Sequence, residues 1–277
     1  MSTRQLSFST FPYMNYKLEY AIERLASWGY QAVELWGGRP HAYAYDLDRD
    51  HIRSIKKALN ANKMTVSAFI PAQFRYPVSL CIDDMTIRQS SIEYIKKSID
   101  ASSDMEIGIV TVCPGHSVYP QSFDSAWNHL KNSLDELTIY AAGKGITLAL
   151  EPAHPMETDL IQTSDDALRI LKELNQDNLK ILLDIGHLNV NKEPFCDAVR
   201  KLKDYLVLIH LDDNHGIFDE HLIPGYGNIN YMPIFKEFAN INYDNCVTLE
   251  LGYNYTTAPD EAAYESFNMA SNFIRNV

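Results

Sequence analysis

The stretch Leu182-Leu183-Asp184-Ile185-Gly186-His187 carries the pattern that decides the fold. In it a short apolar run, rich in strand-forming residues, ends in an acidic residue. The same arrangement recurs through the second half of the chain, with these runs and polar residues: Ile146–Leu150 with Glu151, Ile181–Leu183 with Asp184, Leu206–Ile209 with His210, and Val247–Leu249 with Glu250. Each polar residue follows the previous one by about one strand–helix unit. The runs are therefore predicted to be consecutive parallel strands whose ends carry the chemistry.

The first half of the chain shows the same alternation of strand-like and helix-like segments. Four further strands are predicted over Leu6–Thr10, Ala32–Trp36, Thr65–Ile70 and Ile107–Cys113. Eight strands alternating with eight helices predict a (β/α)8 TIM barrel, formed as a single domain over residues 1–277. An open, doubly wound sheet is the alternative. The barrel is favoured because it brings the ends of the last four strands around one mouth.

Two helix ends can be read from local signals. Thr163 with Asp166 forms the pattern of a capping box that opens the fifth helix. Gly143 and Gly145 mark the end of the helix before it.

Composition limits the classes of function. The chain has 277 residues and a formal net charge of −12, whereas nucleic-acid binders normally carry a basic surplus. No apolar run approaches membrane-spanning length, and Met1–Gln5 shows no signal-peptide pattern. The four cysteines form no C-x-x-C pair, which is typical of free thiols in a reducing compartment. We therefore expect a cytoplasmic protein that binds neither nucleic acid nor membrane, with homo-oligomerisation left open.

The four strand-end residues form a metal-ligand set. Each of the acids alone would more commonly be structural or solvated, and a histidine that ends an apolar strand can be a core residue. Together, three carboxylates and one imidazole suit one divalent cation, Mn²⁺ foremost, with Mg²⁺, Co²⁺ or Zn²⁺ as alternatives. Two carboxylates around one substrate would also serve acid–base chemistry.

A family resemblance follows from these motifs. The segments that resemble the xylose-isomerase-like barrel superfamily are Ala149–Pro152, Leu183–His187, Ile209–Asp212 and Leu249–Leu251. Within it, Val33–Ala42 and His221–Gly227 resemble the fructoselysine branch of the ketose 3-epimerases. The resemblance implies a metal-dependent sugar epimerase or isomerase acting on a ketose or ketose derivative of the fructoselysine or psicose type.

The resemblance also implies roles for particular residues. Glu151 and Glu250 would be the catalytic pair, removing a proton from one face of the carbon beside the ketone and returning one to the other. A divalent cation held by Glu151, Asp184, His210 and Glu250 would stabilise the enediolate. Glu157 and His187 would orient substrate hydroxyls.

Further residues are expected to line the substrate pocket. Trp36, with Tyr13 and Phe69, would form its apolar wall, although core packing is an equal alternative. Arg39 could grip a carboxylate on the distal part of the substrate, or it could pair with Asp46 or Asp48. His116 and His221 are expected to line the pocket and bind substrate.

Three other hypotheses remain open. A branch of the superfamily cuts DNA at abasic sites with three zinc ions, and His116, His187 and the Asp219–His221 pair match some of its extra ligands. Against it, the position after the third strand offers Phe69, Pro71 and Gln73 instead of histidine. An aldose–ketose isomerase or a dehydratase could use the same metal. A sugar-binding or regulatory barrel is disfavoured because both glutamates are present.

Overall fold

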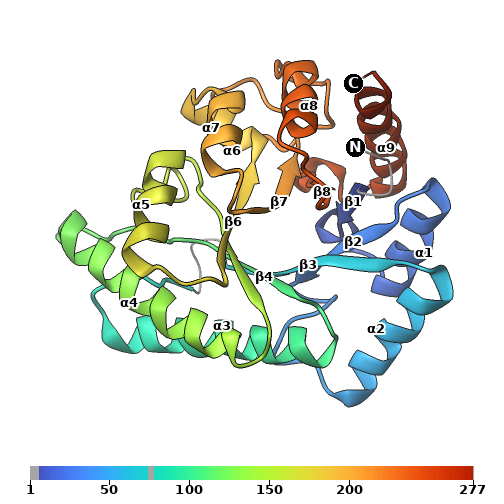
Figure 1. The fold of residues 1–277 in the computed structure, drawn as a ribbon. Helices are drawn as coiled ribbons and strands as arrows, with labels where there is room; N and C mark the ends of the chain where they lie inside the picture. The colour runs from blue at the N-terminus through green and yellow to red at the C-terminus, as the bar shows by residue number, and fades with distance from the viewer. Residues whose placement is uncertain (1–5, 74–77, 277) are drawn as a thin grey trace.

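Eight parallel strands pair in chain order and close on themselves in the computed structural model, which describes residues 6–73 and 78–276 (Figure 1). The strands are β1 (Leu6–Ser9), β2 (Ala32–Gly37), β3 (Thr65–Pro71), β4 (Ile109–Val112), β5 (Thr147–Leu150), β6 (Leu179–Asp184), β7 (Leu206–Leu211) and β8 (Val247–Leu249). Pairing of β1 with β8, with Leu6 opposite Val247, closes the barrel. The predicted TIM barrel is thus confirmed, and the open sheet is excluded.

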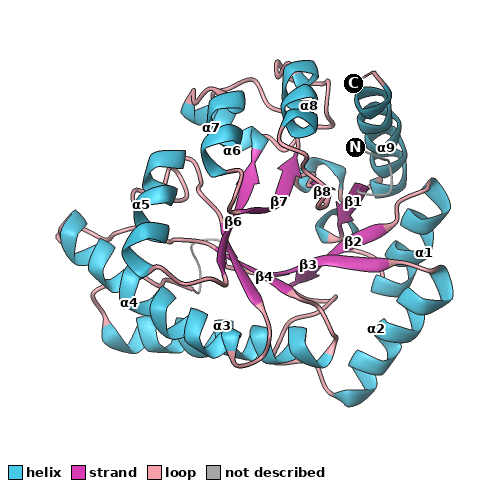
Figure 2. Cartoon of the chain, in the orientation of Figure 1, coloured by secondary structure: helices cyan, strands magenta, loops and turns pink. Residues whose placement is uncertain are grey.

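The helices form a ring outside the strands, as Figure 2 shows. They are α1 (Leu18–Trp28), α2 (Arg49–Asn62), α3 (Met85–Asp104), α4 (Phe123–Ala142), α5 (Ser164–Leu174), α6 (Ile185–Asn191), α7 (Phe195–Leu202), α8 (Tyr231–Asn240) and α9 (Pro259–Arg275), with short 3-10 turns η2 (Phe11–Tyr13) and η3 (Tyr253–Tyr255). The short helix α6 was not predicted. It begins directly at the end of β6, with no loop to mark it.

Local signals account for where several helices begin and end. The capping box is confirmed: the Thr163 side chain accepts from the Asp166 backbone N–H, and the Asp166 carboxylate accepts from the Thr163 N–H. Helix α4 ends at Ala142, with Gly143 as its cap residue. Asp184 caps α6, because its side chain accepts a hydrogen bond from the backbone N–H of His187.

The interior of the barrel is layered. Side chains alternate along a strand, so residues two apart share a face. Leu182 and Leu208 are opposite each other and pack with Ala68 and Ala149 in a small apolar cluster separate from the main core. The next inward pair toward the strand ends is Asp184 opposite His210. The polar site therefore lies directly on an apolar floor.

Two further observations concern the cysteines and the helices. All four cysteines are free. Within the described part of the chain, none of the helices combines the length and apolar character needed to cross a bilayer.

Candidate metal centre and active site

The four predicted metal ligands meet at one point. Ligand atoms of Glu151, Asp184, His210 and Glu250 all lie within 4.8 Å of one another. The His210 Nδ1 atom is 2.8 Å from a Glu250 oxygen, 3.4 Å from a Glu151 oxygen and 3.7 Å from an Asp184 oxygen. Asp184 and His210 are fully buried, and the Glu250 side chain is 16% exposed. The centre is thus almost completely shielded from solvent, and Glu250 is its most exposed ligand.

A buried glutamate fixes the orientation of the histidine. His210 Nε2 lies 2.9 Å from an oxygen of Glu34, and both side chains are completely buried. A carboxylate accepts, so Nε2 carries the proton and the Nδ1 lone pair faces the three acids. His210 Nδ1 and Asp184 Oδ2 are buried without hydrogen-bond partners. Orphaned buried donor atoms that converge in this way fit a divalent cation.

Glu34 was missed by sequence reasoning. It lies in β2, opposite Ser9 of β1 and Ala68 of β3. The available signal was a single acid inside the otherwise apolar segment Ala32–Trp36. An ionisable group in such a run is costly to bury without a partner.

The two glutamates predicted to be catalytic have opposite electrostatic environments. Burial raises the pKa of Glu151 to about 7, and the proximity of His210 offsets only part of this effect. Burial acts in the same direction on Glu250, but attraction to His210 outweighs it and lowers the Glu250 pKa to about 2. Two carboxylates with pKa values driven apart form the usual arrangement of an acid and a base in one site.

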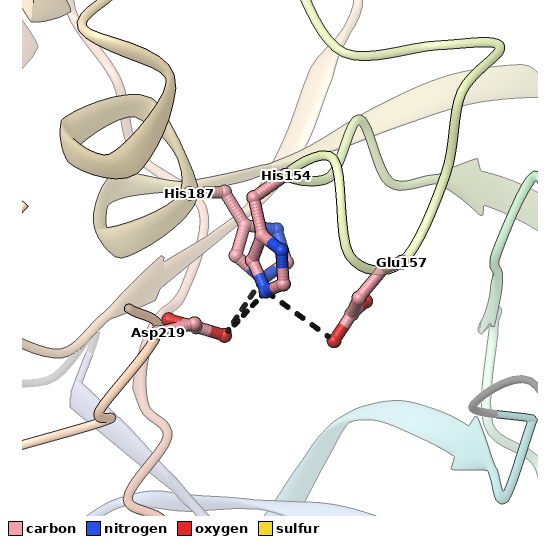
Figure 3. A group of neighbouring side chains, drawn as sticks. All are labelled: His154, Glu157, His187 and Asp219. Carbon is pink, nitrogen blue, oxygen red and sulfur yellow. Dashed lines mark hydrogen bonds and ion pairs between the residues drawn. The ribbon is translucent and has the colours of Figure 1, made fainter. Parts of the chain in front are cut away.

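A second polar cluster adjoins the first. Figure 3 shows His154, Glu157, His187 and Asp219 with their side chains converging, and their ligand atoms lie within 4.8 Å of one another. The His187 Nε2 atom is 3.1 Å, and the His154 Nε2 atom 3.3 Å, from Asp219 Oδ2. His154 Nε2 is also 3.7 Å from a Glu157 oxygen. Glu157 and His187, expected to hold substrate, are therefore neighbours.

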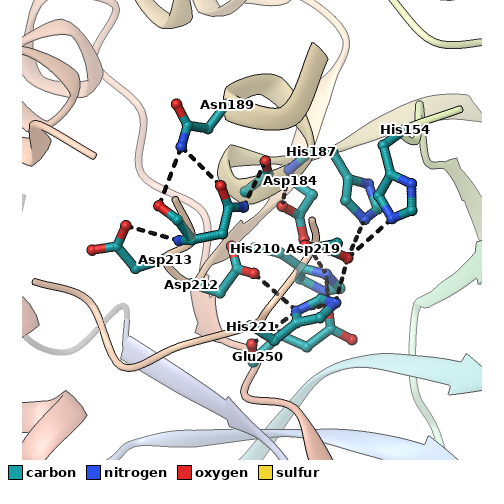
Figure 4. Close-up of polar contacts among 12 residues, drawn as sticks. His154, Asp184, His187, Asn189, His210, Asp212, Asp213, Asp219, His221 and Glu250 are labelled. Carbon is teal, nitrogen blue, oxygen red and sulfur yellow. Dashed lines mark hydrogen bonds and ion pairs between the residues drawn. The ribbon is translucent and has the colours of Figure 1, made fainter. Parts of the chain in front are cut away.

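His221 connects the two clusters, as Figure 4 shows. Its Nε2 atom is 2.7 Å from Asp219 Oδ2, and its Nδ1 atom is 2.9 Å from Asp212 Oδ2. Nδ1 also lies 3.2 Å from the Glu250 backbone carbonyl, to which it can donate. Asp212 follows β7 directly, and its Oδ1 atom is buried without a hydrogen-bond partner. His154 and Asp212 join Glu34 as site residues that sequence reasoning did not assign.

The loop after β7 is held over the barrel by Asp213. Its side chain accepts hydrogen bonds from the backbone N–H groups of Gly225 and Ile229, at 2.8 and 3.2 Å. The Asp213 and Leu222 backbones pair as an antiparallel bridge. At Gly227 any side chain would collide with the Asp213 carboxylate. This folded loop places Asp219 and His221 beside the strand ends.

Arg39 and His116 lie outside these clusters. The Arg39 guanidinium is paired with both oxygens of Asp46, at 2.5 and 2.8 Å, and its side chain is 67% exposed. The ion pair with Asp46 that the sequence left open is thus the arrangement in the structure. His116 contacts the Ser117 carbonyl at 2.8 Å and Asp159 at 3.5 Å.

The three aromatic residues predicted to line the pocket, Trp36, Tyr13 and Phe69, lie in different surroundings. Trp36 packs edge-on against Phe11, with ring centroids 5.3 Å apart, and Phe11 packs against the exposed Tyr253. Tyr13 is buried and donates a hydrogen bond to Asp260, and Phe69 is completely buried. Core packing therefore accounts for Tyr13 and Phe69, and Trp36 belongs to a separate aromatic group that includes a solvent-exposed ring.

The surface also has hollows away from the strand ends. One lies along α2 and is lined by basic residues, among them Arg49, Arg53 and Lys56. A small cavity lined by Gln73, Cys113 and Glu157 adjoins the second cluster. The hollow along α2 contains none of the four metal-ligating side chains, so the candidate site lies at the strand ends.

The chain is similar to known proteins over most of its length. The chain is 31% identical to fructoselysine 3-epimerase of Shigella flexneri over 242 residues, covering 87% of this chain and 88% of that protein. It is 22% identical to D-psicose 3-epimerase of Agrobacterium fabrum, covering 83% and 77%. The crystal structure of a D-tagatose 3-epimerase-like protein superposes with a TM-score of 0.82 at 22% identity, covering 97% of this chain and 98% of that one. The model of the xylose isomerase-like TIM barrel family matches residues 22–272, and the chain belongs to that family.

Proposed function

We propose that the chain is a divalent-metal-dependent 3-epimerase whose substrate is a ketose or a ketose derivative of the fructoselysine or psicose type. The observation that carries this proposal is the pair Glu151 and Glu250, each with an oxygen within 3.4 Å of His210 Nδ1, in a group of four side chains that could hold a metal ion. The 31% identity to a fructoselysine 3-epimerase over most of both chains supports the same class of reaction.

The cation would be held by Glu151, Asp184, His210 and Glu250. Mn²⁺ is our first choice for a set of three carboxylates and one imidazole, with Mg²⁺, Co²⁺ or Zn²⁺ as alternatives. When bound, the ion supplies Lewis acidity that stabilises negative charge on the ketone oxygen and its neighbour. Glu34 holds His210 in the tautomer that this role requires.

Proton transfer is assigned to the two glutamates. Inversion at the carbon beside a ketone needs one group to take the proton from one face and another to supply a proton on the opposite face. Glu250, whose pKa is lowered by His210, would accept the proton, and Glu151 would supply one to the opposite face. In the reverse direction the roles exchange.

Substrate orientation is assigned to residues beside this pair. Glu157 and His187 would contact hydroxyl groups, and His221 lies between them and Glu250. Trp36 and its neighbour Phe11 would provide an apolar wall. The predicted substrate contacts of Arg39 and His116 stay predictions; Arg39 is paired with Asp46, and His116 Nδ1 lies 3.5 Å from Asp159.

The abasic-site endonuclease is the weaker hypothesis. It would need donors from the loops after β3 and β4 at the centre. Gln73, after β3, donates to the Thr111 carbonyl at 2.9 Å and accepts from the Cys113 N–H at 3.1 Å. His116, after β4, is paired with Asp159. Among the described residues, His116 is not in any of the groups whose ligand atoms converge, and the Gln73 amide is used in these two backbone hydrogen bonds.

The test is a substrate panel. Purified chain loaded with Mn²⁺ is incubated with fructoselysine, psicose, fructose and tagatose, and the products are identified by NMR. The proposal predicts C3 epimers as products, with Glu250→Gln inactive and Glu237→Gln, a matched change at an acid paired with Arg200 on the outside of the barrel, fully active. An aldose product would favour the isomerase, and no conversion of any ketose by the metal-loaded chain would contradict the proposal.

A further inference from the structure

His41 is a buried histidine that lies outside the metal centre, in the loop between β2 and α2. Its Nε2 atom lies 3.0 Å from the Tyr13 carbonyl oxygen and 3.1 Å from the Tyr16 carbonyl oxygen. Carbonyl oxygens only accept hydrogen bonds, so Nε2 carries the proton and donates to this pair. Both carbonyls belong to the segment that follows β1. The His41 side chain therefore ties the loop after β2 to the loop after β1.

The second ring nitrogen of His41 reaches the end of β2 through Thr10. Burial lowers the pKa of His41, so the ring is neutral at neutral pH and its Nδ1 atom has a free lone pair. The Thr10 hydroxyl lies 3.3 Å from Nδ1 and can donate to this lone pair. The same hydroxyl oxygen accepts a hydrogen bond from the Trp36 backbone N–H at 2.9 Å. His41, Thr10 and Trp36 are thus connected by consecutive hydrogen bonds.

Three neighbours surround the Trp36 ring. Phe11 and His41 both pack edge-on against it, with ring centroids 5.3 and 5.8 Å away. The indole also lies against the Gly38 backbone, because a Cβ atom at Gly38 would be only 2.1 Å from Trp36 Cζ2. Since His41 is anchored to the loop after β1, its ring is a fixed surface on which the indole rests.

The position of Trp36 on its strand places it near the metal centre. Trp36 comes two residues after Glu34 on β2, and side chains two apart on a strand share a face. Glu34 points into the barrel, where it contacts His210 at 2.9 Å. The Trp36 side chain therefore lies on the same side of β2 as Glu34 and closer to the mouth of the barrel.

We propose that His41 is a positioning residue that fixes the Trp36 ring as a wall of the substrate pocket, an inference that rests on the proposed function. His41 would act through Trp36 and take no part in proton transfer or metal binding. Without the His41 ring and its hydrogen bonds, the two loops lose a shared anchor and the indole gains space to turn away from the bound sugar. Binding of the ketose should then weaken, while the chemistry at Glu151 and Glu250 is unchanged.

The kinetic test uses the Mn²⁺-loaded chain and whichever of fructoselysine, psicose, fructose and tagatose it converts fastest. His41→Leu removes both ring nitrogens and should raise KM by about 10-fold, with kcat within about twofold of the wild type. Thr10→Val removes only the hydroxyl and should also raise KM. His41→Gln retains a donor for the two carbonyls and should recover most of the affinity. His51→Leu, the same change at an exposed histidine of α2, should leave both constants unchanged.

A double-mutant cycle shows whether His41 acts through Trp36. In a Trp36→Ala background, His41→Leu should change KM by less than about twofold, because the wall that His41 supports is already absent. An equal increase of KM in both backgrounds would overturn the proposal, as would a loss of kcat at unchanged KM. A His41→Leu chain that unfolds at a lower temperature but keeps the wild-type KM would show that His41 only stabilises the fold, and this result would also overturn the proposal.

A second measurement needs no substrate and separates this proposal from the proposed function. Acrylamide quenching of tryptophan fluorescence is measured for the wild type and His41→Leu, each with and without Trp36→Phe, so that the Trp36 contribution is obtained by difference. This contribution should be quenched more strongly in His41→Leu, and equal quenching would overturn the positioning role.

The two measurements also cover the cases in which one of them fails. If the wild type converts none of the ketoses, the proposed function is wrong and the quenching result alone decides whether His41 holds Trp36. If His41→Leu does not fold, as judged by circular dichroism, Thr10→Val replaces it in both measurements with the same expected and contradicting results.

Discussion

Removing the acid behind His210 should weaken metal binding without unfolding the chain. Glu34 and His210 are completely buried and 2.9 Å apart, and His210 Nε2 has no other recorded partner. Loss of a partner behind a metal-binding histidine typically costs about 10–100-fold in affinity. That range corresponds to about 1.4–2.8 kcal/mol.

Two substitutions of Glu34 should weaken metal binding by different amounts within this range. Glu34→Gln keeps an amide oxygen that can accept from Nε2–H, so the ring stays oriented and only the charge is lost; we expect about 10-fold weaker binding. Glu34→Ala leaves the Nε2–H without an acceptor and frees the ring, so about 100-fold is expected.

The assay is competition for Mn²⁺ with a fluorescent chelator, with thermal unfolding of the metal-free chains measured in parallel. Glu34→Gln keeps an oxygen that can accept from the His210 Nε2–H, so this variant should still show a cooperative unfolding transition without metal. Glu237→Gln, the same change at an acid paired with Arg200, is the control and should bind Mn²⁺ as tightly as the wild type. Wild-type affinity in a folded Glu34→Ala variant would refute the proposed role of Glu34.

Three further predictions follow from the same geometry. Glu151→Gln and Glu250→Gln should each reduce epimerase turnover by about 10²–10⁴-fold at saturating metal, measured by NMR of the products, and near-normal turnover in either would exclude the two-carboxylate mechanism. The metal-free chain should lose stability as pH rises from about 5 to 8, because the pKa of Glu151 is raised from 4.5 to about 7 and its ionisation in the fold then costs up to about 3 kcal/mol. Burial lowers the pKa values of His187, His210 and His221, but the surrounding carboxylates raise them by more, so loss of their protons also destabilises the fold as pH rises. A melting temperature that increases from pH 5 to pH 8 in the presence of chelator would contradict this electrostatic account. Arg39→Ala should change KM for fructoselysine and for a simple ketose equally, by less than about twofold, because the exposed guanidinium is already paired with Asp46; a loss confined to fructoselysine would show that Arg39 reaches the substrate.

The fold and the four metal-ligating positions could be predicted because both depend on local patterns. Period-two alternation fixes which side of a strand a residue faces, and a closed barrel brings consecutive strand ends together. Leu182 and Asp184 are two apart on β6, as are Leu208 and His210 on β7. The register then places Asp184 opposite His210.

The remaining site residues depend on tertiary contacts that sequence spacing does not specify. Glu34 is 176 positions from His210, and only closure of the barrel brings them together. The D-x-x-H spacing of Asp184 and His187 is also that of a helix cap, and reading it so would have revealed α6. Asp219 and His221 reach the site through a folded loop held by Asp213, whose geometry follows from backbone contacts.

Deuterium incorporation from solvent tests the central claim most directly. The claim is that Glu151 and Glu250 exchange a proton at the carbon beside the ketone of a bound ketose. Metal-loaded chain incubated with its ketose substrate in D₂O should produce both C3 epimers carrying deuterium at C3, with no label elsewhere and none in Glu250→Gln. Epimerisation without deuterium at C3, or label at C1 with an aldose as product, would contradict the account.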